Sequence, residues 1–473
     1  MTDSNSNYSD LPLGWKRVKL PYFCHLIMGQ SPPSSTYNTQ KIGLPFYQGK
    51  SEFGHIYPNP QKYCSKPNKI AEKGDILLSV RAPVGATNVC LEKSCIGRGL
   101  AALRPLENSS TKFIFFLFRY LEPILAKAGT GTTFKAINKD FLCQLELNVP
   151  PLPEQHRIVE KIEELFSELD NGVASLKKAL EQLKTYRQAV LKWAFEGKLT
   201  EKWRNTHQDS LEDADTLLEQ IKAERKRHYQ QQLEDWKQAL KEWENNGKET
   251  KKTTAPRKQE YYSPLKQEET NKLWKIPDKW TWEKVGNICQ SIVPNRDKPK
   301  SFSGNIPWIT TPDIDSDLIT LKLLPNHLGL NINEVELYNA RVIPKNSVIM
   351  TCVGSFGIVC INTISCVINQ QLHAFMTHSY INNKYLAYAL KIQQSWMEKK
   401  STSTTVVYLN KTNSNSVPIP LCSLQEQTKI VQEIESRLSI CDQLEATLTE
   451  NLDKAEALRQ SILKRAFEGK VVL

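Results

Sequence analysis

The sequence of 473 residues lacks the features of several protein classes. It has no run of 18 apolar residues, so we expect no transmembrane helix, and its first ten residues are polar, unlike a secretion signal. Its 11 cysteines include no C-x-x-C pair, so neither a zinc site nor a disulfide framework is indicated. Buried free thiols in a reducing compartment are the simpler interpretation, and we predict a cytoplasmic protein.

Catalytic motifs are also missing. The sequence contains no G-x-x-x-x-G-K-[ST] loop for nucleotide phosphates, no glycine-rich dinucleotide turn and no Asn/Asp-Pro-Pro-Tyr/Phe tetrapeptide of the adenine methyltransferases. His373 and His378 are five residues apart, which is out of phase with a two-ligand helix face. We therefore predict no catalytic residue, no metal site and no cofactor in this chain.

The composition is that of a globular protein with a basic surplus. Hydrophobic residues make up 40% and charged residues 24%, and 62 Lys and Arg against 51 Asp and Glu leave a net charge of +11. A positive balance of this kind suits an acidic partner such as a nucleic acid.

An internal repeat organises the chain. Residues 154–198 align with residues 426–470 at a constant offset of 272, and 20 of these 45 positions are identical. Both segments begin with Glu-Gln and end with Ala-Phe-Glu-Gly-Lys. The offset continues upstream, where Lys73 matches Lys345 and Gly85 matches Gly357. We predict two copies of one unit, with alike second halves and diverged first halves.

The alike halves carry heptad-spaced apolar residues, from Ile158 to Val190 and from Ile430 to Ile462. Prolines precede both stretches, and Gly197 and Gly469 follow them, as at helix starts and stops. Two such stripes most simply bury each other as a coiled-coil pair, although ordinary bundle helices remain an alternative and the sequence does not fix their direction. The Ala-Phe-Glu-Gly-Lys ends and a repeated arginine are candidate partner contacts: Arg187, Phe195, Glu196, Arg459, Phe467 and Glu468.

Residues 201–272 have no counterpart in the second copy and are polar and charged. Ser210 and Asp213 resemble a capping box ahead of a helical apolar pattern. A solvated, partly helical connector is the simplest interpretation, and docking of a partner through Trp236 and Trp243 is an alternative.

The diverged halves combine short strand patterns with helices, such as Ile76–Val80 and Val348–Cys352 among the strands and 112–125 and 384–397 among the helices. We predict a small mixed α+β fold for each. Their loops are rich in Arg, Lys, Gln, Ser and Thr, which read bases and position phosphates. The candidate DNA-binding residues are Ser34, Tyr37, Arg81, Arg98, Lys135, Arg296, Lys298, Lys300, Thr351, Gln370, Gln371 and Lys411.

With these features together, the sequence resembles the specificity subunits of type I restriction–modification systems, which serve phage defence. The resemblance covers nearly the whole chain. It is carried by P-x-x-W at Pro12–Trp15 and Pro277–Trp280, GQSPPSSTYN from Gly29, KGDILLSVRAPVG from Lys73, LPEQHRIV from Leu152 and the two AFEGK ends.

The resemblance implies an α+β protein with two target-recognition domains separated by two long helices that form an antiparallel coiled coil. Each domain would read one half of a bipartite, asymmetric DNA site, and the helices would set the gap and dock two methyltransferase subunits. Restriction subunits would join them, so that the complex is a DNA adenine methyltransferase and an ATP-dependent endonuclease. S-adenosylmethionine, ATP and Mg²⁺ would belong to the partner subunits.

The predicted boundaries are 1–152 for the first domain, 153–200 for the first helix, 201–272 for the connector, 273–422 for the second domain and 423–473 for the second helix. Two departures from the pattern concern the second domain, which has Asn346-Ser347 in place of Gly74-Asp75 and Gly354-Ser355 in place of Ala82-Pro83. Two other functions stay open: a coiled-coil scaffold without a DNA role, and a stand-alone DNA-modifying enzyme.

Overall fold

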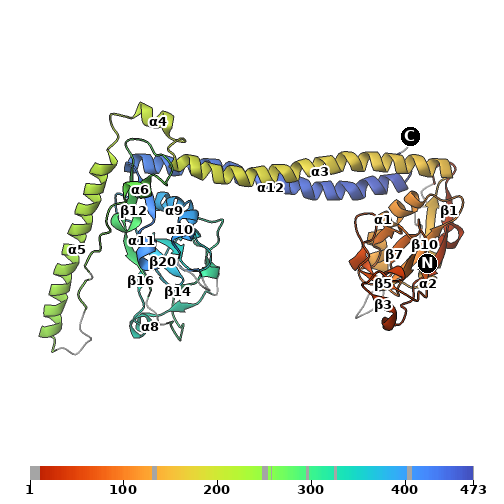
Figure 1. Cartoon of the computed structure of the whole chain (residues 1–473), viewed down its shortest axis with the longest axis horizontal. Coiled ribbons are helices and arrows are strands. Elements are labelled where there is room, and N and C mark those ends of the chain that lie inside the picture. Colours follow the sequence, from red (N-terminus) through yellow and green to blue (C-terminus); the bar gives the residue numbers. More distant parts are fainter. Residues whose placement is uncertain are drawn as a thin grey trace, which may run out of the picture. The chain divides into compact units, whose positions relative to one another are not determined.

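A computed structural model describes residues 11–129, 136–247, 254–256, 258–294, 298–323, 327–401 and 407–471. The chain divides into two compact units (Figure 1). Unit 1 comprises Met1–Leu180 and Ala446–Leu473, and unit 2 comprises Glu181–Glu445. Each unit therefore contains one diverged half and a part of each of the two repeated segments.

Besides its parts of the two repeated segments, the described part of unit 1 contains three small sheets and the helices α1 and α2. A two-stranded ladder pairs β1 with β11, a four-stranded sheet has the order β2-β10-β7-β8, and a five-stranded sheet has the order β3-β5-β4-β9-β6. The elements are β1 (Lys16–Lys19), β2 (Cys24–Met28), β3 (Tyr37–Asn38), β4 (Leu44–Tyr47), β5 (Lys62–Cys64), β6 (Ile70–Ala71), β7 (Ile76–Ser79), β8 (Thr87–Val89), β9 (Ser94–Ile96), β10 (Leu100–Pro105), α1 (Thr111–Ala128), α2 (Lys139–Gln144) and β11 (Glu146–Val149).

Unit 2 repeats this plan. A two-stranded ladder pairs β12 with β21, and two four-stranded sheets have the orders β13-β20-β17-β18 and β15-β14-β19-β16. The elements are β12 (Thr281–Lys284), α7 (Val285–Ile288), β13 (Gln290–Ile292), β14 (Ile306–Ile309), β15 (Gly329–Leu330), α8 (Ile332–Leu337), β16 (Val342–Ile343), β17 (Val348–Thr351), β18 (Val359–Ile361), β19 (Cys366–Ile368), β20 (Leu372–Met376), α9 (Asn383–Lys391), α10 (Gln394–Lys400), α11 (Lys411–Asn415) and β21 (Pro418–Leu421).

The predicted strands and helices of the diverged halves are largely confirmed. The fully buried strands β7 and β17 lie at the predicted apolar runs, and α1 covers the first predicted helix. The second predicted helix is instead two helices, α9 and α10. The helix is interrupted between Lys391 and Gln394. Within this interruption, the buried side-chain amide of Gln393 donates a hydrogen bond to the Pro418 carbonyl oxygen at 2.6 Å.

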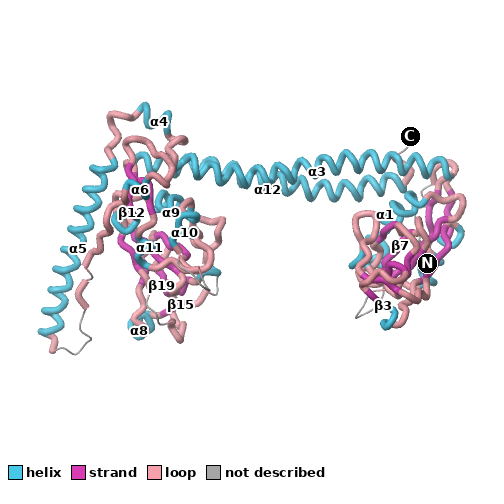
Figure 2. The backbone as a smooth tube through the Cα atoms, in the orientation of Figure 1, coloured by secondary structure: helices cyan, strands magenta, loops and turns pink. Residues whose placement is uncertain are grey.

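The repeated segments form helices of 44 residues each, α3 (Leu152–Phe195) and α12 (Leu424–Phe467). In unit 1, Ile158 and Ile162 near the start of α3 share a core with Leu463 and Phe467 at the end of α12. Figure 2 shows the helical tubes of α3 and α12 side by side. In unit 2, the end of α3 shares a core with Ile430 and Ile434 near the start of α12. In both units the start of one helix therefore lies beside the end of the other. This confirms the antiparallel coiled coil, whose direction the sequence pattern left open.

The first turn of each long helix holds its domain through side-chain hydrogen bonds. In unit 1, the Trp15 indole Nε1 donates to the Glu154 carboxylate at 2.9 Å. The Gln155 amide accepts from the Ser110 backbone N–H at 2.9 Å and donates to the carbonyl oxygens of Asn108 and Pro150. The repeated Glu-Gln pair is therefore a structural anchor, which the motif alone does not reveal.

Unit 2 reproduces this anchor. The Trp280 indole donates to Glu426 at 2.9 Å. Gln427 accepts from the Asn382 N–H at 3.0 Å and donates to the carbonyl oxygens of Tyr380 and Cys422, which follow Asn108 and Pro150 by the same 272 residues. Because both copies keep the anchor while the domains have diverged, each long helix is attached to its domain in the same way.

The last residue of each long helix is buried in the core of a unit. Phe195 is fully buried with its ring 5.2 Å from Tyr385, and Phe467 is 5% exposed with its ring 5.3 Å from Phe113. These two phenylalanines were predicted as partner contacts. The structure corrects this, since the rings lie in the cores of units 2 and 1 and offer almost no surface to another chain.

The connector contains α4 (Glu201–Thr206), α5 (Ala214–Asn245) and α6 (Gln267–Thr270). The predicted capping box of Ser210 and Asp213 does not form. Asp213 is itself the N-cap residue of α5 and accepts from the Asp215 N–H at 3.1 Å, and Ser210 donates to the His207 carbonyl oxygen. Leu217 and Ile221 of α5 pack into the core of unit 2. The connector is therefore docked along part of its length.

Two sequence-based expectations about the whole chain can be compared with the structure. All 11 cysteines are free, and all except Cys143 are buried, which confirms that they are unpaired thiols. Among the described residues, no helix has both the length and the apolar character needed to cross a membrane.

We predict that Phe467→Ala destabilises unit 1 by about 3–5 kcal/mol, because it removes a buried ring and leaves a cavity between α12 and α1. Chemical denaturation monitored by circular dichroism measures the change. Trp193→Ala is the matched control, since this aromatic side chain of α3 is 37% exposed. A loss no greater than that of the control would show that the ring does not anchor the helix end.

Candidate nucleic-acid interface

In unit 1, backbone hydrogen bonds gather three loops next to the four-stranded sheet. Val80 N–H donates to the Gly99 carbonyl oxygen at 2.9 Å, and Ile137 N–H donates to the Val80 carbonyl oxygen at 3.0 Å. Gln30 N–H donates to the Ile96 carbonyl oxygen at 3.1 Å. The loops that carry Arg81, Arg98 and the Gln-Ser-Pro-Pro segment therefore lie together, although they are far apart in the sequence.

The two arginines of this cluster are exposed. The backbone N–H of Arg98 donates to the Ser31 hydroxyl at 3.2 Å, which ties the two loops together. Within the described part of the chain, neither the Arg81 nor the Arg98 guanidinium makes a hydrogen bond or an ion pair. Arg104, in contrast, is committed to Asp75 at 2.9 Å. Two uncommitted guanidinium groups on adjoining loops can bind phosphates or guanine edges.

Ser34 lies on the third loop, and Tyr37 begins strand β3 directly after it. Tyr37 stacks on Phe46 with ring centroids 4.6 Å apart, and its hydroxyl donates to the Pro32 carbonyl oxygen at 2.8 Å. Desolvation raises the pKa of this hydroxyl. Ser34 is exposed in a short 3-10 helix (Ser34–Thr36). Lys135, predicted alongside them, lies outside the described residues.

Unit 2 builds the equivalent cluster from different residues. Cys352 N–H donates to the Gln371 carbonyl oxygen at 2.8 Å, and Leu409 N–H donates to the Cys352 carbonyl oxygen at 2.8 Å. Gln370 stands 272 positions after Arg98. Gln370 and Gln371 are both exposed, and the Gln371 side-chain oxygen accepts from the Thr311 hydroxyl at 3.1 Å. An amide therefore replaces a cation at the same place in the fold, and amides are suited to adenine rather than guanine.

Other predicted residues of unit 2 lie elsewhere. Thr351 is fully buried, and its hydroxyl donates to the Ser355 carbonyl oxygen at 2.6 Å, so the structure corrects its prediction as a DNA contact. Lys298 and Lys300 are exposed on either side of the buried Pro299. Arg296 falls outside the residues that the structure describes.

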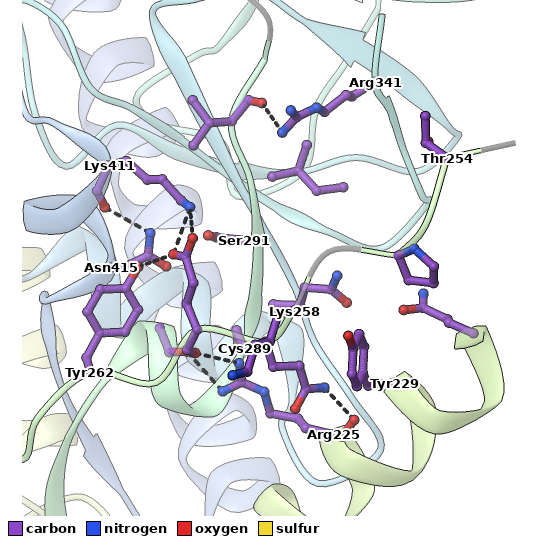
Figure 3. A pocket seen from close by; sticks show the side chains of 18 of the residues that line it. Arg225, Tyr229, Thr254, Lys258, Tyr262, Cys289, Ser291, Arg341, Lys411 and Asn415 are labelled. Carbon is purple, nitrogen blue, oxygen red and sulfur yellow. Dashed lines mark hydrogen bonds and ion pairs between the residues drawn. The ribbon is translucent and has the colours of Figure 1, made fainter. Parts of the chain in front are cut away.

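Lys411 lines a cavity of about 640 Å³ between α5 and the sheet of unit 2 (Figure 3). Its ammonium pairs with Glu260 of the connector at 2.6 Å, so a phosphate would have to compete with this carboxylate. Arg225 of α5 crosses the same region and donates to the Gly286 carbonyl oxygen at 2.9 Å. Burial lowers the pKa of Arg225. This cavity is built mainly by the docking of the connector.

The first departure in the second domain, Asn346-Ser347 in place of Gly74-Asp75, keeps the turn. Asn346 adopts φ +65°, in the left-handed region that Gly74 occupies at φ +90°, and asparagine tolerates this conformation better than most residues. Asp75 accepts from the Glu72 N–H, whereas Ser347 donates to the Pro344 carbonyl oxygen at 2.8 Å. Both copies therefore close the turn with the side chain of the same position.

The predicted arginine contacts of the long helices are used within the chain. Arg187 pairs with Asp442 at 2.7 Å in unit 2. Its equivalent Arg459 pairs with Asp170 and lies 4.8 Å from the Phe166 ring in unit 1. These pairs connect the two helices within their units.

The remaining partner candidates are half-buried glutamates at the helix ends. Glu196 pairs with Lys198 at 2.6 Å, and Glu468 pairs with Lys470 at 2.8 Å. Both glutamates stay predictions as partner contacts.

Electrostatics and geometry give no sign of a metal centre. No group of three or more His, Cys, Asp or Glu residues that could hold a metal ion occurs in the described ranges. The imidazole of His373 stacks on the Phe375 ring with the ring centroids 4.8 Å apart. Burial lowers the pKa of this imidazole to about 3. The clusters present in the described residues are loops with hydrogen-bonding and basic side chains.

Comparisons with known proteins agree with this organisation. A putative type I restriction enzyme MjaX specificity subunit of Methanocaldococcus jannaschii is 40% identical over 198 residues, which are 41% of this chain and 45% of that relative. The type I restriction enzyme EcoBI specificity subunit of Escherichia coli is 24% identical over 478 residues, which are 97% of this chain and 86% of the relative.

The fold has known counterparts as well. A solved structure described as the structural basis of complex assembly and conformational transition of the type I R-M system has a TM-score of 0.65 and 18% identity, and covers 98% of this chain and 100% of its own. The crystal structure of the HsdS subunit from Thermoanaerobacter tengcongensis has a TM-score of 0.56 and 17% identity, with 98% and 99% covered.

The family model described as the type I restriction modification DNA specificity domain matches residues 12–183 and 277–454. Each match takes in one diverged domain and most of the long helix that follows it. The chain therefore belongs to the family of type I restriction–modification specificity subunits.

Proposed function

We propose that this chain is the non-catalytic DNA-reading subunit of a type I restriction–modification complex, in which each domain reads one half of a bipartite, asymmetric site. The observation that carries the proposal is the pair of equivalent loop clusters in the two units. The backbone frame is the same in both, with Val80–Gly99 matched by Cys352–Gln371, but the exposed side chains differ. The same backbone arrangement with different exposed side chains would allow the two domains to recognise two different half-sites.

The long helices supply the second part of the proposal. Each contributes residues to both units and is anchored to its own domain by the Glu-Gln pair. Helices attached in this way would hold the unread gap at a fixed length and dock two methyltransferase subunits. Restriction subunits would then join the complex. S-adenosylmethionine, ATP and Mg²⁺ would be bound by these partners, and this chain would contribute none of the chemistry.

Two alternatives are weaker. A coiled-coil scaffold accounts for α3 and α12 but leaves the exposed Arg81 and Arg98 loops without a role. A stand-alone enzyme would need catalytic groups, and the loop clusters offer guanidinium and amide groups rather than a nucleophile or paired carboxylates. Incubation of the purified chain with DNA and Mg²⁺, or with DNA and S-adenosylmethionine, separates this alternative from the proposal, since only an enzyme changes the DNA.

The first test is selection from a random duplex library by the chain together with its methyltransferase subunits, followed by sequencing of the bound DNA. We expect two unlike short motifs at a fixed separation. A single contiguous motif would contradict the bipartite model, and no enrichment by the assembled complex would favour the scaffold.

The cluster in unit 1 leads to a substitution test. We predict that Arg98→Ala weakens binding of the selected site by about 1–3 kcal/mol and relaxes the sequence requirement in one half-site only, because a bidentate contact to a base is lost. Fluorescence anisotropy on a panel of single-base variants measures both effects. Arg465→Ala, an exposed arginine on α12, is the matched control. Equal weakening on every duplex would identify Arg98 as a phosphate contact instead.

The helices lead to a mechanical test. We predict that one heptad inserted beside Arg187 in α3 and one inserted beside Asp442 in α12 lengthen the gap by about three base pairs. Seven helical residues add roughly 10 Å, against roughly 3.4 Å per base pair, and a heptad keeps the apolar seam in phase. Repeating the library selection gives the new separation. Half-sites at their original spacing would show that the helices do not set the gap.

A further inference from the structure

Unit 2 contains a buried carboxylate whose set of hydrogen bonds is completed by residues at the start of the connector. Glu426, with its side chain 2% exposed, accepts from the Trp280 indole at 2.9 Å, from the Thr200 hydroxyl at 2.8 Å and from Arg204 Nη1 at 2.7 Å. Thr200 and Arg204 come from the segment that directly follows the end of α3. The carboxylate at the start of α12 is therefore fully paired.

Arg204 also holds the end of α3. Its Nη2 donates to the Gly197 carbonyl oxygen at 2.9 Å, and the guanidinium carbon lies 5.8 Å from the centre of the Trp280 ring. Gly197 has φ +73°, and a Cβ at this position would come within 2.4 Å of Pro277. One arginine thus joins a carboxylate, an indole face and the carbonyl at a helix end.

Unit 1 has the same frame. The Trp15 indole donates to Glu154 at 2.9 Å, as Trp280 does to Glu426. Gly469 ends α12 with φ +71°, and a Cβ there would come within 2.4 Å of Pro12 and 3.5 Å of the Trp15 ring. Carboxylate, indole, glycine carbonyl and proline of unit 1 therefore correspond one by one to those of unit 2.

The described residues of unit 1 provide no cation that pairs with Glu154. Among the described residues, Glu154 accepts only the Trp15 indole, and its side chain is half-buried. Val472, the counterpart of Thr200, has no hydroxyl. Residues 1–10 and 471–473, which adjoin this place in the sequence, contain no arginine or lysine.

We infer that Glu154, the Trp15 ring and the Gly469 carbonyl form a binding site for a guanidinium group, and that an arginine of the methyltransferase subunit at unit 1 occupies it. A planar guanidinium can donate to a carboxylate and a carbonyl at once and stack on an indole, as Arg204 does. The identity of the occupant rests on the proposed function. Because Arg204 already fills the site of unit 2, the two methyltransferase subunits would attach by different contacts.

The test transplants the occupant of unit 2 into unit 1. Residues 471–473 are replaced by a copy of residues 199–209, so that an arginine follows Lys470 at the distance at which Arg204 follows Lys198. The first matched control is the same graft with glutamine in place of this arginine. The second is the arginine graft in a Glu154→Gln chain, whose amide oxygen still accepts from Trp15.

Two measurements follow. Thermal unfolding should show a Tm about 2–4 °C higher for the arginine graft than for the glutamine graft, with no difference between the grafts in the Glu154→Gln chain. Light scattering of complexes with methyltransferase subunits should show two bound per chain for the glutamine graft and one for the arginine graft, because the grafted arginine occupies the site in advance.

Each contrary result has its own meaning. Equal stability of the two grafts would overturn the guanidinium site. A stabilising arginine graft that still binds two subunits would overturn the choice of occupant, as would loss of one subunit with both grafts, which indicates steric blocking. Failure of the ungrafted chain to bind any methyltransferase subunit would refute the proposed function, and the stability comparison would still decide whether the site accepts arginine.

Discussion

The fold depends on a hydrogen bond between an indole and a carboxylate at the start of each long helix. Trp15 with Glu154, and Trp280 with Glu426, lie beside glutamines that satisfy backbone groups of the domain. Burying a polar group without a hydrogen-bond partner lowers the stability of a fold. This network therefore favours a single position of each domain on its helix. The loops of a domain can then change without disturbing the attachment, which explains why the repeat is strong in the helices and weak upstream.

The two units use this common frame with different chemistry. Exposed arginine in unit 1 stands where unit 2 has exposed glutamine, and the carboxylate that unit 2 pairs with Arg204 is less completely paired in unit 1. The connector accounts for the second difference, because Thr200 and Arg204 donate to Glu426 from the segment that follows α3. A chain with two alike units thereby acquires two distinguishable ends, a property suited to reading an asymmetric site.

Much of the apparent functional signal in the sequence turned out to be structural. Phe195 and Phe467 belong to conspicuous repeated motifs, yet both rings are core residues at the helix ends. Thr351 is the last residue of strand β17, next to a loop, yet it is buried with a satisfied hydroxyl. Repetition within a chain marks positions under a common constraint, and burial against a conserved frame is such a constraint as much as partner binding is.

The sequence by itself determined the repeat, the two long helices, the buried free thiols and the mixed character of the domains, because heptad spacing, short apolar runs and turn residues act locally. Tertiary structure alone decided the direction of the coiled coil, since an apolar stripe packs equally well in either sense until domains are attached to its ends. It also decided that Arg81 and Arg98 are neighbours, through the Val80–Gly99 hydrogen bond. Hydrogen bonds between distant segments leave no spacing in the sequence by which they could be found.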